Sequence, residues 1–251
     1  FIRERFPFVN RITTYCRSKT AARKSIEDLK QLKEAGLSRI HIGLESGYDP
    51  LLQFIRKGVT AAEHIVGGQK VKAAGISLSE YIIPGLGGER WSKEHAGETA
   101  RVLNEINPDF IRLRSLYVKS GTSLMELMER GEFKILSDDA VVREIKDFLA
   151  RLEGIQSTIV SDHILNLLEE VEGNLPEDRD KLIAVMDRYL SLSAKERLVF
   201  RLGRRRGIYR GLDDMYDQKT FAGLSSIVEQ YEKNEEGSLD RYLSMIMHNY
   251  V

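Results

Sequence analysis

The stretch Arg39–Thr60, RIHIGLESGYDPLLQFIRKGVT, and the later segment Tyr81–Glu89, YIIPGLGGE, decide the predicted fold. Each begins as an apolar run typical of a β-strand, ends in a glycine-rich turn and leads into the pattern of a helix. In a parallel α/β sheet such turns lie at the same edge, where ligands bind. The two segments therefore predict one ligand site at the carboxyl ends of parallel strands.

The rest of the chain extends this alternation and then departs from it. Strands are predicted at 11–15, 39–44, 76–84, 110–118 and, briefly, 158–160. Helices are predicted at 21–35, from Asp49-Pro50, and at 60–74, 92–106, 123–130 and 138–153. This order favours right-handed βαβ crossovers and a parallel sheet. Beyond Asp162 only charge-rich helices are predicted, at 164–171, 176–190, 194–202, 221–233 and 239–247.

The composition limits the class of protein. The 251 residues are 42% hydrophobic, which is enough for a barrel-type domain or a domain with an appendage. The 38 basic and 38 acidic residues balance, so no overall charge favours nucleic acid or an anionic membrane. No apolar run approaches the roughly 18 residues of a membrane span, and the single Cys16 excludes an internal disulfide framework. We expect a cytoplasmic protein.

Glu45 and the glycines after the next strand are the first candidate site residues. Glu45 ends its strand, where a carboxylate can accept hydrogen bonds from the ammonium group or hydroxyls of a ligand. It can equally pair with Lys57 or Arg112 inside a barrel. Gly85 and Gly87 let the backbone approach a ligand closely, because they carry no Cβ. Their spacing fits neither a Walker loop nor a dinucleotide fingerprint.

Two arginines and a histidine form a second candidate set. Arg112 and Arg114 lie two residues apart on a predicted strand, so they face the same side and require carboxylates, from Glu45 or from a substrate. The alternative is a surface pair on an edge strand. His163 is a candidate general acid or base, although Asp162 and His163 can equally be the cap and first turn of a helix. We predict catalytic roles for Arg112, Arg114 and His163.

A basic run near the C-terminus has two readings. Its arginines alternate with Tyr209 and could contact phosphates. A solvated helix end that pairs with Asp213 and Asp214 is the preferred interpretation. The run comprises Arg201, Arg204, Arg205, Arg206 and Arg210.

Taken together, IHIGLESGYDPLL, KGVT and YIIPGLGGE resemble the radical S-adenosylmethionine (radical SAM) superfamily, in its Elp3/MiaB/NifB-type branch. The later segments INPDFIRLRSLYV and VSDHILNLLEEVEG resemble bacterial Fe–S oxidoreductases. The resemblance implies a partial parallel (β/α) barrel of the TIM-like type over residues 1–162 and an α-helical C-terminal extension over 163–251. It also implies an oxidoreductase whose 4Fe–4S cluster, held by a CxxxCxxC loop, cleaves S-adenosylmethionine. The resulting 5′-deoxyadenosyl radical abstracts a hydrogen from a substrate.

The resemblance also assigns roles to individual residues. Glu45 takes the polar position that contacts the cofactor, and Lys57 the basic position that meets its methionine carboxylate. The segment from Tyr81 to Gly85 and the end of the following strand lie beside the adenine. The implied cofactor-binding residues are Glu45, Ser46, Lys57, Tyr81, Ile83, Gly85, Gly87, Ser115 and Leu116.

The chain departs from the family in its cysteines. The CxxxCxxC loop and the strands before residues 11–15 are missing, so we expect a fragment that by itself is inactive. It should hold neither a cluster nor tightly bound S-adenosylmethionine, and no metal ligand is predicted. Its substrate is unknown, and an uncovered sheet edge favours self-association. Two alternatives stay open: a cluster-free (β/α) barrel lyase or aldolase that binds an anionic substrate, and a non-catalytic helical binding or scaffold module.

Overall fold

A six-stranded sheet forms the centre of the computed structural model, which describes residues 1–234 and 237–248. Its strands follow one another in space in their order along the chain. The first five are parallel, and β6 is antiparallel to β5. They are β1 (Ile12–Cys16), β2 (Leu37–Glu45), β3 (Ser77–Ile82), β4 (Phe110–Leu113), β5 (Thr158–Val160) and β6 (Gly173–Asn174).

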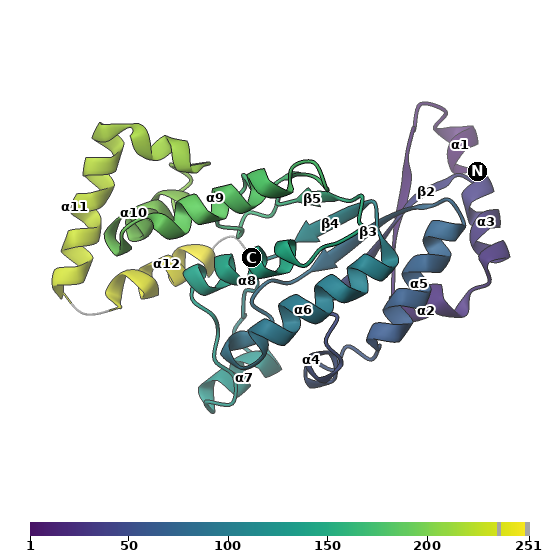
Figure 1. Cartoon of the computed structure of the whole chain (residues 1–251), viewed down its shortest axis with the longest axis horizontal. Helices are drawn as coiled ribbons and strands as arrows, with labels where there is room; N and C mark the ends of the chain where they lie inside the picture. The colour runs from purple at the N-terminus through teal and green to yellow at the C-terminus, as the bar shows by residue number, and fades with distance from the viewer. Residues whose placement is uncertain (235–236, 249–251) are drawn as a thin grey trace.

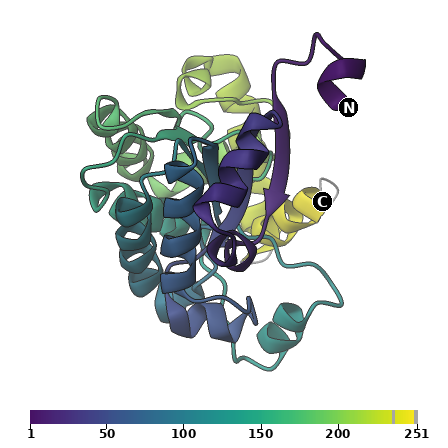
Figure 2. The same cartoon turned by 90° about the vertical axis from the view of Figure 1, so that its right-hand side faces the viewer.

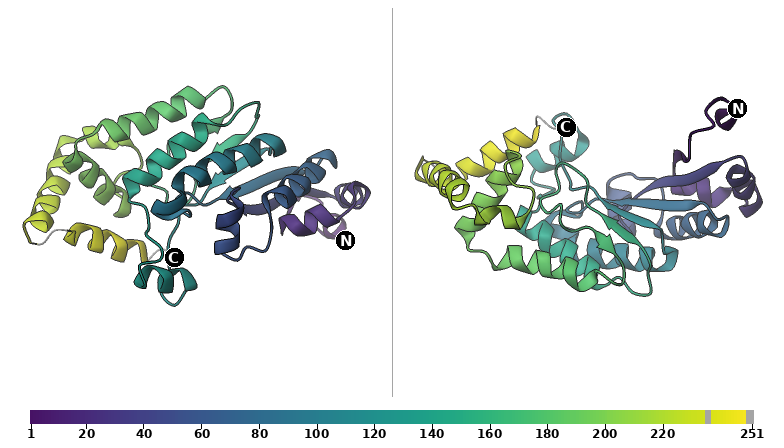
Figure 3. Two further views of the ribbon diagram at one scale, coloured as in Figure 1. Left: turned by 60° about the horizontal axis from the view of Figure 1, so that its bottom comes forward. Right: turned by 90° about the horizontal axis from the view of Figure 1, so that it is seen from above.

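The helices between the strands cover one face of this sheet (Figures 1 and 3). Sequential strand order with right-handed crossovers places every crossover helix on the same side. Accordingly α2 packs on α5, α5 on α6, α6 on α8 and α8 on α9. The helices up to this point are α1 (Ile2–Arg5), α2 (Ser18–Arg23), α3 (Ile26–Glu34), α4 (Asp49–Phe54), α5 (Ala61–Ala73), α6 (Gly88–Ile106), α7 (Ser123–Glu129) and α8 (Asp138–Ala150).

The C-terminal part is helical and lies at the end of the sheet away from β1 (Figure 1). It consists of α9 (Arg179–Ser191), α10 (Ala194–Arg205), a 3₁₀ turn at Leu212–Tyr216, α11 (Gln218–Asn234) and α12 (Ser238–His248). Helices α10, α11 and α12 pack on one another. The predicted fold class is confirmed: an open, parallel (β/α) barrel-type sheet is followed by an α-helical region.

Local signals in the sequence explain several helix starts. Thr60 and Glu63 form a reciprocal capping box at the start of α5, as their spacing predicts. The predicted helix 21–35 is wrong in one respect, because it is two helices. Ser25 forms a second capping box with Asp28 and starts α3 there. The 110–118 strand is also shorter than predicted, since β4 ends at Leu113.

The predicted helix 164–171 is wrong, because this segment has no regular secondary structure. Its leucines are buried, as a helical face requires, but its carbonyl groups are bonded elsewhere. Arg205 donates to the carbonyl of Leu165 at 2.7 Å, and Arg204 donates to that of Leu167 at 2.9 Å. Side chains of α10 therefore hold this segment in an irregular conformation.

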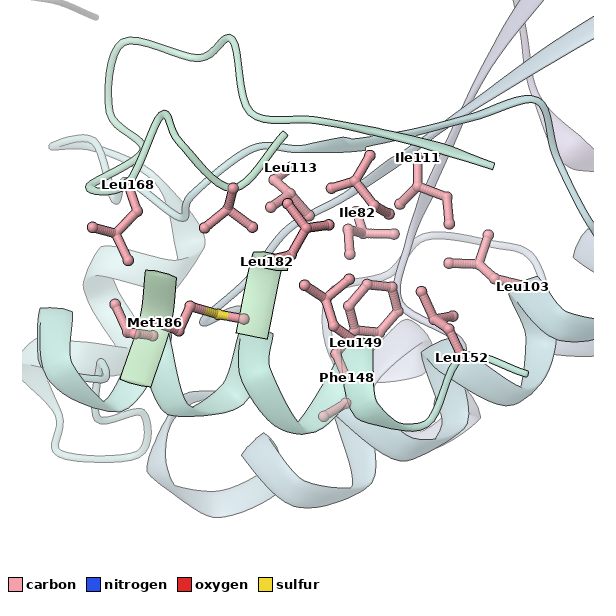
Figure 4. Packing of buried hydrophobic residues seen from close by; sticks show 14 of the residues in the cluster. Ile82, Leu103, Ile111, Leu113, Phe148, Leu149, Leu152, Leu168, Leu182 and Met186 are labelled. Atoms are coloured by element: carbon pink, nitrogen blue, oxygen red, sulfur yellow. The ribbon is translucent and has the colours of Figure 1, made fainter. Parts of the chain in front are cut away.

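One continuous hydrophobic core joins the sheet to the C-terminal helices (Figure 4). Strand residues Ile82 and Ile111 lie beside Leu149 of α8, while Leu182 and Met186 of α9 extend the same cluster (Figure 4). This core crosses the boundary predicted at residue 162. The division into 1–162 and 163–251 remains a prediction.

Strand β1 forms one margin of the sheet, and α1 stands apart from it (Figure 2). Within the described residues β1 pairs with β2 alone, and its central residues are exposed. The self-association expected at such an edge stays a prediction. Among the described helices, none combines the length and the apolarity that crossing a bilayer requires.

Candidate functional site

Glu45 and Lys57 form an ion pair at the end of β2, each side chain about a quarter exposed. Glu45 has a φ of 64°, a left-handed conformation that is uncommon outside glycine and that gathers at functional sites. Gly43 makes room for the pair, because a Cβ there would lie 2.9 Å from Oε1 of Glu45 and 3.2 Å from Nζ of Lys57. The structure thus gives Glu45 the partner Lys57 rather than Arg112.

A buried polar network joins the two strand-end turns. His95 of α6 contacts the Ser46 hydroxyl with Nδ1 at 2.9 Å and the Ile83 carbonyl with Nε2 at 3.0 Å. Since a carbonyl only accepts, Nε2 carries the proton, and Nδ1 accepts from Ser46. Burial lowers the pKa of His95 to about 4, so the ring is neutral at pH 7. The turn that follows Glu45 is therefore fixed to the turn that precedes Gly85.

Glu144 of α8 completes this network from the other side. Its Oε1 accepts from the backbone N–H of Gly85 at 2.6 Å, and its Oε2 accepts from the Ser92 hydroxyl at 2.5 Å. Burial raises the pKa of Glu144 to about 7, although these two hydrogen bonds act in the opposite direction. Its Oε1 also lies 3.8 Å from Nε2 of His95. Sequence reasoning missed both residues, because each lies on a helix without a motif around it.

The glycine turn serves packing within the protein as well as access for a ligand. Gly85 has a φ of 86° and lines a cavity, whereas a Cβ on Gly87 would lie 2.8 Å from the carbonyl oxygen of Trp91. A Cβ on Gly88 would lie 2.6 Å from the carbonyl oxygen of Lys134. Of the three glycines, Gly85 is the one whose freedom a ligand could use.

A cavity of about 550 Å³ opens beyond the ends of β3 and β4. Gly85, Ser115 and Leu116 lie in its wall, together with apolar side chains of α7, α8 and α12. Asn166 also lines this cavity and fixes the end of β4 by accepting from the N–H of Ser115 at 3.0 Å. The ion pair of Glu45 and Lys57 does not line this cavity. The cofactor-binding roles predicted for these residues remain predictions.

Arg112 and Arg114 face the same side of β4, and β4 lies between β3 and β5 rather than at an edge. Each donates to Asp162, from Arg112 at 2.6 Å and from Arg114 at 2.7 Å. Burial opposes ionisation of Asp162, but the two guanidinium groups outweigh it and lower its pKa. The carboxylate that this pair requires is thus Asp162, and Asp162 does not cap a helix.

His163 and Tyr81 lie away from the cavity wall. His163 is half-buried, with Nδ1 unpartnered, and burial together with Arg114 lowers its pKa. Tyr81 points to the face of the sheet opposite the crossover helices, where Arg114 lies 4.9 Å from its ring centre. The structure therefore separates the predicted residues into a strand-end group and a group on this second face.

The basic run of α10 is not a solvated helix end, contrary to the preferred interpretation. Arg201 and Arg205 pair with Asp138 of α8, and Arg204 pairs with Glu169. Asp213 instead pairs with Arg188 of α9. Arg201, Arg204 and Arg205 face inward because α10 buries the side of the helix that carries Arg205, which is 4% exposed. Arg206 and Arg210 of the same run are exposed, as the preferred interpretation expects.

The fold and this site define a parallel (β/α) barrel-type protein whose polar and glycine-rich turns gather at the carboxyl ends of its strands. The family model of the radical SAM superfamily matches residues 7–100, which contain β1 to β3 and both strand-end motifs. The resemblance stated from the sequence is confirmed over these residues, which match the model of a superfamily whose members are enzymes.

Known proteins also match part of this chain, at low sequence identity. A tRNA uridine(34) acetyltransferase of Methanocaldococcus jannaschii is 26% identical over 125 residues, which are 47% of this chain and 22% of the relative. YtqA of Bacillus subtilis is 24% identical over 124 residues, 49% of this chain and 38% of YtqA. The chain thus spans well under half of the length of either relative.

Two solved structures are also similar to the chain. An archaeal Elp3 of Methanocaldococcus infernus with an N-terminal deletion has a TM-score of 0.47 and 22% identity, over 56% of this chain and 32% of Elp3. The [FeFe]-hydrogenase maturase HydG has a TM-score of 0.42 and 14% identity, over 96% of this chain and 63% of HydG.

Proposed function

We propose that this chain supplies the S-adenosylmethionine-holding edge of a radical SAM enzyme. One observation carries the proposal: the strained Glu45, its partner Lys57 and the open Gly85 turn are fixed to one another within the matched residues. For the whole protein we propose reductive cleavage of S-adenosylmethionine and hydrogen abstraction from a substrate. The acetyl transfer in the name of the archaeal relative is not part of this proposal, because the chain spans 22% of it.

The residues at the strand ends fit the chemical groups of S-adenosylmethionine. The Lys57 ammonium can bind the methionine carboxylate, while the Glu45 carboxylate can accept from the amino group or the ribose hydroxyls. Gly85 lies in the cavity wall, and its φ of 86° is one that glycine adopts without strain. Ser115 and Leu116 border a largely apolar cavity that suits a planar base.

Binding of S-adenosylmethionine to the purified chain tests this proposal. We expect weak affinity, with a Kd of about 1 mM, which is about 4 kcal/mol of binding free energy. Lys57→Met should weaken binding at least about ten-fold, because a charge-assisted hydrogen bond contributes about 1.5–3 kcal/mol. Ligand-observed NMR measures the affinity.

The control is Lys93→Met, which replaces an exposed lysine on α6. Absence of binding at about ten times the expected Kd, or equal loss in both variants, contradicts the proposal.

The described residues do not fit a 4Fe–4S cluster. They contain one cysteine, half-buried Cys16, and within the described ranges no three histidine, cysteine or carboxylate side chains converge on a metal position. The cysteine lies on the helix-covered side of β1 and packs against the core. No step through a cluster is therefore derived for this chain.

Anaerobic reconstitution with iron and sulfide should consequently leave the 251-residue chain without a stoichiometric 4Fe–4S cluster. The physical reason is that a cluster of this type needs three or four thiolates, and Cys16 supplies one. Iron and sulfide analysis after desalting measures the content, and Cys16→Ser is the control for iron bound nonspecifically by the thiol. A chain that retains four iron and four sulfide per molecule would refute this expectation.

A further inference from the structure

Three rings gather on the face of the sheet opposite the crossover helices, outside the strand-end site. Tyr15 of β1, His41 of β2 and Tyr81 of β3 point to this face, because Tyr15 lies opposite His41 and Tyr81 opposite Gly43 in the strand register. The rings of Tyr15 and His41 have centroids 5.1 Å apart and lie nearly parallel, and His41 and Tyr81 are 5.4 Å apart. Tyr15 is 75% exposed, so its outer ring face is free to stack on a ligand.

Arginines surround these rings. Arg39 of β2 and Arg112 and Arg114 of β4 lie on the same face, and we call these three residues with Tyr15, His41 and Tyr81 the arginine face. After burial, the main cause that lowers the pKa of His41 is the charge of these arginines and of Arg11. The imidazole is therefore neutral at pH 7, and the positive charge of the face comes from guanidinium groups.

The acidic partners of this face do not balance its charge. Asp162 binds Arg112 and Arg114 together. Burial and the charges of Arg11 and Arg112 lower the pKa of Arg39. Asp109 acts against them, but its carboxylate is already bound to Lys72 at 2.6 Å. Among the described residues, four guanidinium groups with Arg11 included thus face Asp162 and Asp109, and Asp109 is shared with a lysine. Glu45, which lies over Gly43 on this face, is already paired with Lys57. This excess favours an anion.

Three polar atoms at or beside the arginine face have no hydrogen-bond partner. Nε of Arg112, Nδ1 of His41 and Nδ1 of His163 are buried and have no hydrogen-bond partner within the described structure. Eight other buried polar atoms of the described residues are also unpartnered, so these three show only that hydrogen-bonding capacity at this face is left unsatisfied. The N–H of Arg112 can donate only to an acceptor, which an anion provides.

We propose that the arginine face binds the substrate, and that this substrate carries a planar ring and an anionic group. The ring stacks on Tyr15 beside His41 and Tyr81. Arg39, Arg112 and Arg114 bind the anion. A nucleoside phosphate and an aromatic carboxylate share this chemistry. The proposal deepens the proposed function by naming a substrate class, and it rests on that function. S-adenosylmethionine is not this ligand, because its sulfonium and ammonium groups outweigh its single carboxylate.

Titration of the purified chain with ring and anion probes tests this inference. The probes are uridine and adenosine monophosphates, the matching nucleosides, inorganic phosphate and indole-3-acetate. We expect a probe with both ring and anion to bind at least about ten-fold more tightly than either half alone, because stacking and charge each contribute. Added salt should weaken binding, since the partners are partly exposed charges. Tighter binding of the monophosphates or of indole-3-acetate identifies the anion as phosphate or carboxylate.

Matched variants locate the site, because the chain holds a second tyrosine–arginine pair of similar geometry. Arg114 lies 4.9 Å from the Tyr81 ring centre and pairs with Asp162, and Arg188 lies 5.3 Å from the Tyr216 ring centre and pairs with Asp213. The tyrosines that are replaced also have similar exposed fractions, 75% for Tyr15 and 71% for Tyr216. Arg114→Gln and Tyr15→Leu should each weaken binding about ten-fold. Arg188→Gln and Tyr216→Leu should leave binding within about two-fold.

Two outcomes overturn the inference: nucleotides that bind no better than nucleosides, and control variants that lose as much affinity as Arg114→Gln. Its failure is distinguishable from failure of the proposed function, because Lys57→Met should weaken S-adenosylmethionine binding and leave the ring-and-anion probes unaffected. If the wild-type chain binds the probes but not S-adenosylmethionine, that result counts against the proposed function alone.

Discussion

Replacing Arg205 with alanine is expected to lower the free energy of unfolding by about 3–5 kcal/mol, the usual cost of removing one member of a buried ion pair. The Arg205 side chain is 4% exposed. It donates to the Leu165 carbonyl at 2.7 Å and to the Asp138 carboxylate at 3.1 Å. Burial opposes ionisation of Asp138, but Arg205 and Arg201 outweigh it and hold its pKa low. Alanine leaves the carbonyl without its donor and removes one of the two guanidinium groups beside Asp138.

Urea unfolding followed by circular dichroism measures this loss, and Arg206→Ala, at the C-cap of α10, is the control. Arg206 is exposed and contacts the hydroxyl and ring of Tyr242, so its replacement should change the free energy of unfolding by less than about 1 kcal/mol. Because Arg205 also holds the irregular 164–171 segment, chymotrypsin should cut there faster in Arg205→Ala. Equal unfolding curves and equal cleavage in the two variants would show that Arg205 does not fix this segment.

The central strands of the sheet could be predicted because one pattern dominates them. Ile40, Ile42 and Leu44 alternate along β2 and are all buried, as a half-covered strand requires. The start of α5 could be predicted because a capping box depends on residues three apart in sequence, Thr60 and Glu63. Both signals are local, so no knowledge of the tertiary structure is needed to read them.

The partners of charged residues could not be predicted in the same way. The alternation of side chains along a strand correctly predicted that Arg112 and Arg114 share one face. Their common partner, Asp162, lies 48 residues beyond Arg114 and reaches them only because β5 pairs with β4. The 164–171 segment carries apolar residues at helical spacing. It stays irregular because arginines on α10 take the carbonyl groups that a helix would use for its own N–H groups.

The buried network of His95 and Glu144 was missed for a related reason. His95 lies on α6 and Glu144 on α8, and the two contact the strand-end turns only because those helices pack side by side. A helical amphipathic pattern predicts apolar residues at the covered positions, so a buried Glu144 has no signal in a single sequence. This network is the feature that connects the two motifs from which the fold was predicted.

Replacing Glu144 with glutamine should remove a pH dependence of stability that the wild-type protein carries. Burial raises the pKa of Glu144 from 4.5 to about 7, so the folded state holds a proton that the unfolded state releases between these values. This contribution is fully present below pH 4.5 and is lost as the pH rises through about 7. At 1.36 kcal/mol per pKa unit, the loss is about 3 kcal/mol. Glutamine keeps an oxygen that can accept from the Gly85 N–H but has no carboxyl proton to lose.

The free energy of unfolding of Glu144→Gln, minus that of wild type, should therefore rise by about 3 kcal/mol between pH 4.5 and 7.5. His95 acts in the opposite direction, because its lowered pKa of about 4 costs stability as the pH falls below 6.5. That contribution is common to both proteins and cancels in the difference. Glu153→Gln, on an exposed carboxylate, should differ from wild type by less than about 0.5 kcal/mol throughout. A Glu144→Gln difference that stays flat or falls as the pH rises would mean that Glu144 ionises in the folded protein as freely as it does in the unfolded chain.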